Sequence, residues 1–198
     1  MGTSILINKL NEFNWANNYI NYINAKKRGT RKIAMAFLNK FILDFFNQID
    51  KERRSFIDLV SQISYETNDY NTYLPVNLYR ECFLNEISKW KKDDPNNPTP
   101  YKWSESFEDN KKALELDSLD QISLEKFSNS LINKISMNQH EIKAGFIYDG
   151  NTLEDILLIN YFEPFIVNIK NSEKREIIKK NLSELKKTAI DYMSEHNK

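Results

Sequence analysis

The sequence predicts an all-α protein built from antiparallel helical hairpins. Apolar residues recur close to every 3.6 positions over most of the 198 residues, as they do on the buried face of an amphipathic helix. The four glycines and five prolines fall almost entirely between these periodic stretches, where residues that break secondary structure belong. No stretch alternates apolar and polar residues for long enough to support a β-sheet. We therefore predict seven or eight helices.

Four helices are expected in the first half of the chain. Their apolar stripes cover residues 6–23, 34–45, 56–63 and 79–90. A turn at 27–30 separates the first two stripes, and a polar segment at 67–72 precedes the fourth. Pro75 suits the first turn of that fourth helix, because an N–H group missing there costs no hydrogen bond.

Residues 91–100 are the best candidate hinge, with three prolines, two aspartates and two asparagines. The length predicts a single all-α domain over 1–198. A subdivision into N-terminal helices, 1–92, and C-terminal helices, 101–198, stays open.

The second half is expected to be helical as well. Three pairs have the spacing of a helix-opening capping box: Ser106 with Asp109, Ser118 with Gln121, and Thr152 with Asp155. The segment 138–150 is expected to be a loop. The run 156–159 is apolar on all sides and predicts a buried central helix. Pro164 should end or kink that helix, and a last helix should start near Ser172.

Two resemblances suggest relatives. The stretch Ala113-Leu114-Glu115-Leu116-Asp117-Ser118 resembles the end of a tetratricopeptide repeat, with Ser118 in place of the usual proline. One copy implies a tetratricopeptide-like hairpin rather than a solenoid, which needs at least three repeats. The segment from Pro100 to Gly150 also resembles a type of small bacterial protein of unknown function. Some of those proteins are encoded beside toxin genes, which implies an immunity-type role.

The composition offers little for catalysis or for cofactors. Two histidines and one cysteine cannot build a His-rich or Cys-rich zinc site, and no Glu-x-x-His pair suggests a di-metal site. No glycine-rich loop resembles a phosphate-binding fingerprint. We therefore expect no enzyme, no metal and no cofactor. A pocket around His140 in the 138–150 loop would revive an enzymatic role.

The N-terminus has no basic segment followed by an apolar core, so we expect no signal peptide. The longest apolar stretch, 33–46, is interrupted by polar residues and is too short to span a bilayer. We expect a cytoplasmic protein that does not enter a membrane. Cys82 lies in a helical apolar pattern and is expected to be an inert buried thiol.

Charge is balanced overall, with 28 basic and 28 acidic residues, but it is uneven along the chain. Residues 105–163 hold twelve acidic and five basic side chains, with aromatic residues among them. An acidic surface with rigid aromatic anchors could capture a basic protein. The candidate partner-binding residues are Trp103, Glu105, Glu108, Asp109, His140, Glu141, Tyr148, Asp149, Glu154 and Asp155. The competing interpretation is that Trp103 is core and that the acids are helix caps and solubilising charge.

Residues 13–43 show the opposite bias, with six basic and no acidic residues. The simplest interpretation is a solvated turn whose cations follow a helix C-terminus. The zero net charge argues against a general nucleic-acid binder.

The sequence thus predicts a non-catalytic protein-binding protein, in particular an immunity-type protein that neutralises a cognate toxin by occlusion. Its partner would be a basic toxin domain, and it would act as a monomer or a homodimer. Two alternatives stay open. One is a tetratricopeptide-like adaptor that binds a peptide in a helical groove. The other is a nucleic-acid-linked regulator that uses the basic patch at 26–32.

Overall fold

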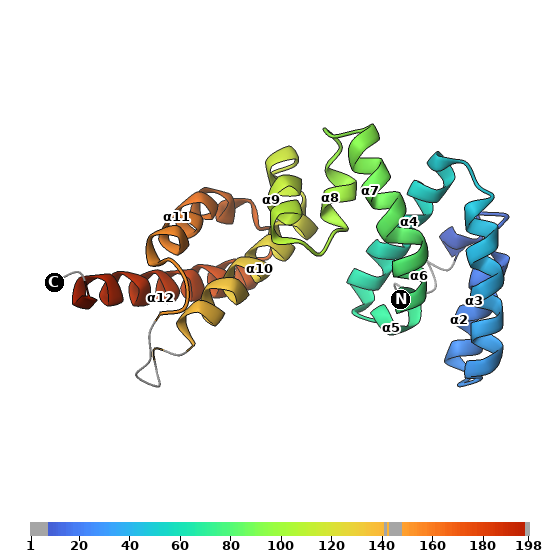
Figure 1. Cartoon of the computed structure of the whole chain (residues 1–198), viewed down its shortest axis with the longest axis horizontal. Helices are drawn as coiled ribbons and strands as arrows, with labels where there is room; N and C mark the ends of the chain where they lie inside the picture. Colours follow the sequence, from blue (N-terminus) through green and yellow to red (C-terminus); the bar gives the residue numbers. More distant parts are fainter. Residues whose placement is uncertain (1–7, 141, 143–147, 197–198) are drawn as a thin grey trace. The chain divides into compact units, whose positions relative to one another are not determined.

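The computed structural model describes residues 8–140, 142 and 148–196, and within them it confirms the all-α class. Eleven α-helices and no β-strand occur in this part of the chain (Figure 1). The count exceeds the predicted seven or eight because three helices are too short for a periodic pattern to reveal them. These three are α5 (Tyr70–Tyr73), α6 (Val76–Leu78) and α8 (Pro98–Lys102).

The chain packs as two compact units, Met1–Trp103 (unit 1) and Ser104–Lys198 (unit 2). The boundary between them closely follows the proline-rich segment 91–100. Unit 1 carries 15 basic and 11 acidic residues, whereas unit 2 carries 13 basic and 17 acidic residues. The two units therefore have opposite net charges of equal size.

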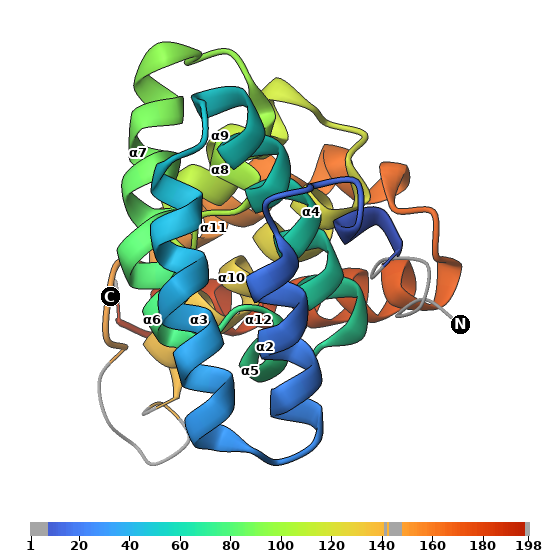
Figure 2. The same cartoon turned by 90° about the vertical axis from the view of Figure 1, so that its right-hand side faces the viewer.

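Unit 1 begins with a hairpin of α2 (Asn17–Lys27) and α3 (Arg31–Phe46), which lie side by side in Figure 2. Gly29 makes the turn between them with a φ of +73°, a conformation that favours glycine. Five of the six cations of the 13–43 segment lie in this turn or in the helix ends beside it, and the sixth, Lys40, lies further along α3.

An aromatic cluster forms the centre of unit 1, where α4 (Asp50–Thr67) joins this hairpin. Tyr19, Phe41 and Phe56 are fully buried, and their ring centroids lie 4.9–5.1 Å apart. The Tyr19 hydroxyl donates a hydrogen bond to the Tyr73 carbonyl, so this buried polar atom has a partner.

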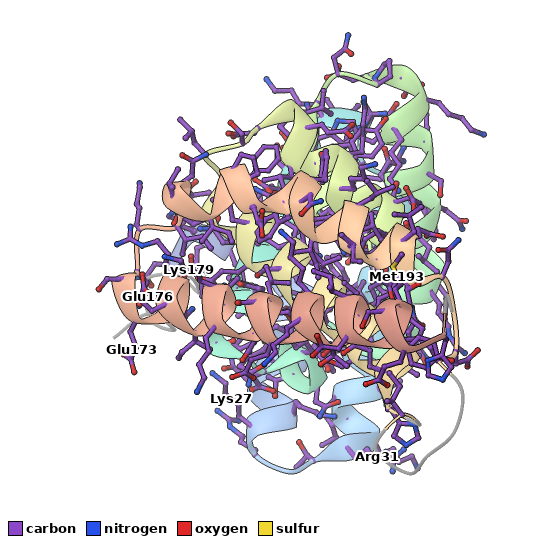
Figure 3. All side chains as sticks on the ribbon, turned by 90° about the vertical axis from the view of Figure 1, so that its left-hand side faces the viewer. Lys27, Arg31, Glu173, Glu176, Lys179 and Met193 are labelled. Atoms are coloured by element: carbon purple, nitrogen blue, oxygen red, sulfur yellow. The ribbon has the colours of Figure 1, made fainter. Side chains whose placement is uncertain are left out.

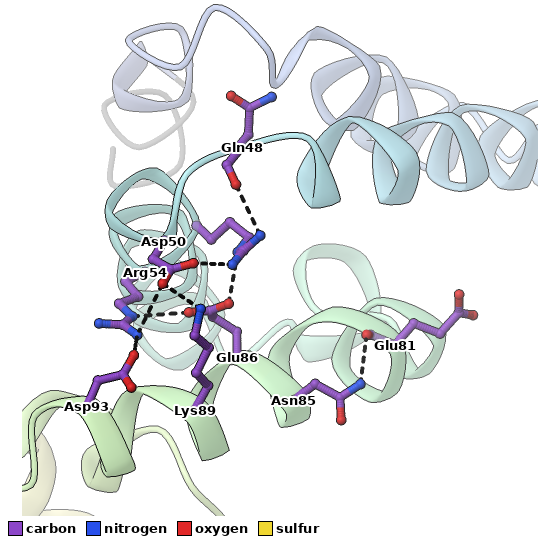
Figure 4. A network of polar contacts seen from close by, with 9 residues as sticks. Gln48, Asp50, Arg54, Glu81, Asn85, Glu86, Lys89 and Asp93 are labelled. Carbon is purple, nitrogen blue, oxygen red and sulfur yellow. Dashed lines mark hydrogen bonds and ion pairs between the residues drawn. The ribbon is translucent and has the colours of Figure 1, made fainter.

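The predicted fourth helix is a rod of three segments: α6, a π-helical segment (Tyr79–Phe83) and α7 (Leu84–Asp93). A network of ion pairs joins α7 to α4 (Figure 4). The buried carboxylate of Glu86 accepts from Arg53 Nε at 2.8 Å and from Arg54 Nε at 3.1 Å. Two cations around one buried anion give this pairing a defined register.

Among its described residues, unit 2 contains four long helices and the 3₁₀ segment that follows the third of them. In chain order these are α9 (Phe107–Leu116), α10 (Gln121–Gln139), α11 (Thr152–Phe162), the 3₁₀ segment Glu163–Asn168 and α12 (Ser172–His196). Their apolar faces meet in one core. Phe127 is fully buried there, with the rings of Phe107 and Phe162 at centroid distances of 5.1 and 5.3 Å.

The helix ends of unit 2 match the sequence predictions in part. Ser106 caps α9 by accepting from the Asp109 N–H, as predicted. Pro164 follows α11 and lies in the 3₁₀ segment, so the predicted end of that helix is confirmed. The start of the last helix at Ser172 is confirmed as well.

Two predicted caps are wrong. Asp120 rather than Ser118 caps α10, and Asn151 rather than Thr152 caps α11. In both cases a side chain that caps at least as well stands within two residues of the predicted one, and spacing alone could not choose between them.

The prediction that 156–159 lies at the centre of the unit is also wrong. Leu157 is 58% exposed, and only Ile159 of the four is fully buried. Helix α11 packs on α12 and α10 through one face, and apolar residues on its other face are left in solvent.

Candidate functional site

The candidate site lies where the C-terminal end of α10 meets the N-terminal end of α11. Helix α10 runs through Gln139, one residue past the start of the predicted loop. The Asp149 N–H donates to the Asn138 carbonyl at 2.9 Å, which holds the returning chain against the end of α10. Gly150 has a φ of +132°, and a Cβ there would lie 2.8 Å from Asn138 Nδ2. The chain therefore turns in a space that only glycine fits.

A buried polar network holds this junction together. Asp155, on the first turn of α11, is 1% exposed. Its Oδ2 accepts from the Tyr148 hydroxyl at 2.6 Å and from Asn138 Nδ2 at 2.9 Å. The Gln139 Nε2 donates to the Leu185 carbonyl of α12 at 2.8 Å and to the Tyr148 hydroxyl at 3.4 Å. Side chains of α10 and α11, backbone of α12 and Tyr148 are thus joined by hydrogen bonds.

The environment of Tyr148 keeps its hydroxyl protonated. Burial, together with the hydrogen bond to Asp155, raises the pKa of Tyr148 well above its usual value. Its ring also packs against that of Tyr192 on α12, with centroids 5.4 Å apart. The neutral Tyr148 hydroxyl therefore serves as a hydrogen-bond donor to the buried Asp155 carboxylate, and this bond fixes the positions of the residues around it.

The outer side of the junction combines apolar and acidic side chains. Met137 is 75% exposed at the end of α10, and Leu153 and Leu157 are exposed on α11. Asp149 and Glu154 are exposed beside them in the sequence, and Glu154 pairs with Lys134 of α10 at 3.2 Å. We call these exposed residues (Met137, Asp149, Leu153, Glu154 and Leu157) the junction surface.

His140 lies beside a hollow of about 580 Å³ between α10 and α12. The lining residues include Gln139, Asn181, Leu185 and Thr188. Glu141, the neighbouring predicted residue, lies outside the described residues. The lining also includes the His140 imidazole and the Glu184 carboxylate, so titratable groups meet amide, hydroxyl and aliphatic groups in this hollow.

The remaining predicted residues divide between the two units. Trp103 is the last residue of unit 1. It is 6% exposed, and its Nε1 donates a hydrogen bond to the Asp58 carboxylate at 2.6 Å. Glu105 and Glu108 are exposed at the start of α9 in unit 2. Asp109 accepts from the hydroxyls of the two preceding serines, so it belongs to the cap of α9.

Most of the acidic block at 105–163 therefore has a structural use. Of its eleven described acids, eight form contacts within unit 2, as helix caps or turns, lysine pairs or the buried carboxylate: Asp109, Glu115, Asp117, Asp120, Glu125, Glu154, Asp155 and Glu163. Among the described residues, the side chains of Glu105, Glu108 and Asp149 have no such partner. The predicted partner-binding residues Tyr148 and Asp155 are buried, so they hold the residues of the junction surface in place and do not form part of it.

Sequence reasoning missed Met137, Asn138, Leu153 and Leu157. Exposed apolar residues cannot be told from core residues until the face of a helix that packs is known. Asn138 is a polar residue at a helix end, and its contact with Asp155 arises only when α10 and α11 meet.

No three side chains of His, Cys, Asp or Glu gather as a metal site among residues 8–140, 142 and 148–196. No helix in this range has the length and apolar character that crossing a bilayer requires. No model of a known protein family, no curated protein and no solved structure matches the chain.

Proposed function

We propose that this chain is a non-catalytic protein-binding protein of the immunity type, which neutralises a cognate toxin by covering its working surface. The junction surface would make the contact. The observation that carries the proposal is the combination of three exposed apolar side chains with Asp149 and Glu154, on a base held by buried hydrogen bonds. An apolar centre with a polar, charged rim is the usual anatomy of a protein interface.

The rigid base supports a binding role over a purely structural one. A surface that is already ordered loses little conformational entropy when a partner docks, and more of the contact energy is left for affinity. Here Asp155 fixes both Asn138 and Tyr148, and Gln139 ties the end of α10 to α12. Exposed residues on either side of that network are therefore presented in one arrangement.

The charge of unit 2 favours a basic partner. Glu105, Glu108 and Asp149 form no ion pair within the described residues, and unit 2 carries four more acids than bases. Unpaired acids around a contact accelerate the encounter with a cationic surface and make the affinity sensitive to salt. Occlusion needs no chemistry from the chain itself.

A reconstitution experiment tests the proposal. The tagged protein is used to isolate its partner from the source cells, and the partner is identified and purified. Binding is then measured by titration calorimetry at low and high salt for the wild type and for Asp149→Lys/Glu154→Lys. The matched control reverses two exposed acids at the start of α12, Glu173→Lys/Glu176→Lys (Figure 3). Asp155 is left unchanged, because its burial would confuse binding with folding.

We expect the junction variant to bind about tenfold or more weakly at low salt, while the control pair keeps nearly wild-type affinity. The partner should arrest growth when expressed alone, and co-expression of this chain should restore growth. Equal affinity of both variants would refute the junction surface as the contact. A partner whose activity is unchanged by a saturating amount of this chain would refute the immunity role.

A tetratricopeptide-like adaptor is the second candidate, and the hollow of about 580 Å³ between α10 and α12 favours it. An adaptor would hold a peptide in that hollow through polar groups such as the Asn181 amide and the Thr188 hydroxyl. Thr188→Arg, which fills the hollow, should then abolish peptide binding, and Asp149→Lys/Glu154→Lys should not. The opposite pattern supports the immunity proposal.

A further inference from the structure

Unit 1 carries a group of cations that its own fold leaves without partners. All six basic residues of the 13–43 segment are exposed, and Figure 3 labels Lys27 and Arg31 among them. Lys27 lies over the Tyr73 ring at 5.5 Å. The other five form no ion pair or hydrogen bond through their side chains within the described residues: Lys26, Arg28, Arg31, Lys32 and Lys40. The described acids of segment 105–163 are, by contrast, mostly engaged.

Helix electrostatics explain only some of these cations. Lys26 and Lys27 occupy the last turn of α2, where the helix dipole stabilises positive charge. Arg31 and Lys32 occupy the first turn of α3, where the dipole destabilises it. That turn has no acidic residue, and Thr30 supplies no side-chain cap. Arg31 and Lys32 are exposed, as a solvated turn requires, but the dipole of a preceding helix C-terminus does not explain their position.

The same helix also exposes apolar side chains. Ile33 is 54% exposed and Leu43 is 67% exposed on α3. A hollow of about 310 Å³ is lined by Lys32, Ile33, Ala36, Phe37 and Lys40. The opposite face of α3 packs in the core of unit 1, where Leu38, Phe41 and Phe45 are buried.

We propose that the outer face of α3 binds an acidic amphipathic helix of a partner protein. Lys32 and Lys40 stand eight positions apart, which is about 12 Å along a helix axis. Two carboxylates seven or eight positions apart on a partner helix match that spacing. The apolar side chains between them would enter the hollow beside Ile33, as in other helix-in-groove contacts. We call Lys32, Ile33, Ala36, Phe37 and Lys40 the α3 groove.

Charge decides against two other occupants. A second copy of the chain docked through the same groove would bring Lys32 and Lys40 of both copies together, and like charges at contact distance are repulsive. A nucleic acid would satisfy the cations but not Ile33, Ala36 and Phe37, because phosphate contacts are polar. An acidic amphipathic helix satisfies both sets. The inference concerns unit 1 and an anionic partner, so it is independent of the proposed function.

A designed peptide can probe the groove directly. The probe is a fluorescein-labelled, 15-residue helical peptide with leucines on one face and glutamates flanking them at seven-residue spacing. One control peptide has lysine in place of every glutamate, and another has the same composition with the leucines scattered. Binding to the full-length protein is followed by fluorescence anisotropy. The protein variants are Lys32→Glu/Lys40→Glu and Ile33→Asn.

A matched variant reverses two exposed lysines elsewhere in unit 1, Lys51→Glu/Lys92→Glu, which have no side-chain ion pair among the described residues. Circular dichroism checks that every variant is folded. We expect the acidic amphipathic peptide to bind the wild type and the matched variant alike. Its affinity should fall about tenfold or more for Lys32→Glu/Lys40→Glu and severalfold for Ile33→Asn.

Several outcomes would overturn the inference. Equal binding of the scattered-leucine peptide would show that charge alone attracts the probe. Tighter binding of a 20-base-pair DNA duplex, lost in Lys32→Glu/Lys40→Glu, would assign the cations to a nucleic acid. Concentration-dependent self-association in sedimentation, abolished by Ile33→Asn, would assign the groove to a second copy. If the acidic peptide binds no more tightly than its lysine counterpart, the α3 groove does not bind an acidic helix and the inference is wrong.

Discussion

Replacing Asp155 by alanine should destabilise the protein by about 3 kcal/mol. The substitution removes two hydrogen bonds to a buried carboxylate, one from the Tyr148 hydroxyl at 2.6 Å and one from Asn138 Nδ2 at 2.9 Å. Bonds to a charged group contribute about 1.5–3 kcal/mol each. Tyr148 is buried, so its hydroxyl proton is left without an acceptor, which lowers the free energy of unfolding by about 2 kcal/mol. Asn138 is only half-buried, so water can replace its partner and the cost there is nearer to about 1 kcal/mol.

Urea denaturation followed by circular dichroism measures this loss, and a double-mutant cycle assigns it. Tyr148→Phe alone should cost about 1–2 kcal/mol, because it removes the hydroxyl and leaves the carboxylate with one donor fewer. In the Asp155→Ala background the same change should cost almost nothing. Asp155→Asn keeps an acceptor oxygen and should cost less than alanine does. If the two single effects add to within about 0.5 kcal/mol in the double variant, the hydrogen bond is not the source of the stability and the network argument fails.

Three further predictions concern other parts of the chain. Glu86→Ala leaves the two arginines of α4 without the buried carboxylate between them. It should lower the free energy of unfolding, measured by urea denaturation, by about 3 kcal/mol. A loss below about 1 kcal/mol would show that solvent already screens the network. Gly150→Ala should cost about 2–3 kcal/mol and Gly29→Ala about 1 kcal/mol, because both have positive φ but only the first Cβ meets a neighbour; equal losses would contradict the close approach to Asn138. Burial, and then the charge of Glu81, raise the pKa of the Cys82 thiol to about 12, so the folded protein should resist iodoacetamide between pH 7 and 10 and react once urea unfolds it. Fast alkylation of the native protein at pH 8 would show that the thiol is open to solvent.

Helix positions were predictable from sequence wherever the periodic pattern was long. Leu38 and Phe41 lie on the predicted buried stripe of their helix and are fully buried. The pattern failed for one-turn helices such as α5, because four residues hold only one period. It also failed for α11, because a helix with apolar residues all round gives no information about which face packs. Packing between helices decides that point, and it depends on the whole chain.

The candidate site was predictable as a region but not as a set of roles. The acids and aromatics near Tyr148 and Asp155 stood out in the sequence, and the structure gathers them at the α10–α11 junction. Which of them face solvent could not be predicted, because a carboxylate at a helix start serves equally as cap, buried acceptor or surface charge. Asp155 carries the same carboxylate group as its neighbour Glu154 but lies one position further round the helix, a step of about 100°. That step takes it from solvent into the core.

The net charge of a segment was a poor guide to the charge available for binding. Segment 105–163 had the larger imbalance, yet eight of its eleven described acids are used inside unit 2. Segment 13–43 had the smaller imbalance, yet five of its six cations have no side-chain partner among the described residues. A charge already paired has lost most of its field at a distance, whereas an unpaired one attracts a partner through about a Debye length of solvent. If the chain has one surface whose binding depends steeply on salt, the α3 groove should therefore show the steeper dependence. The junction surface should depend more on its exposed leucines and methionine.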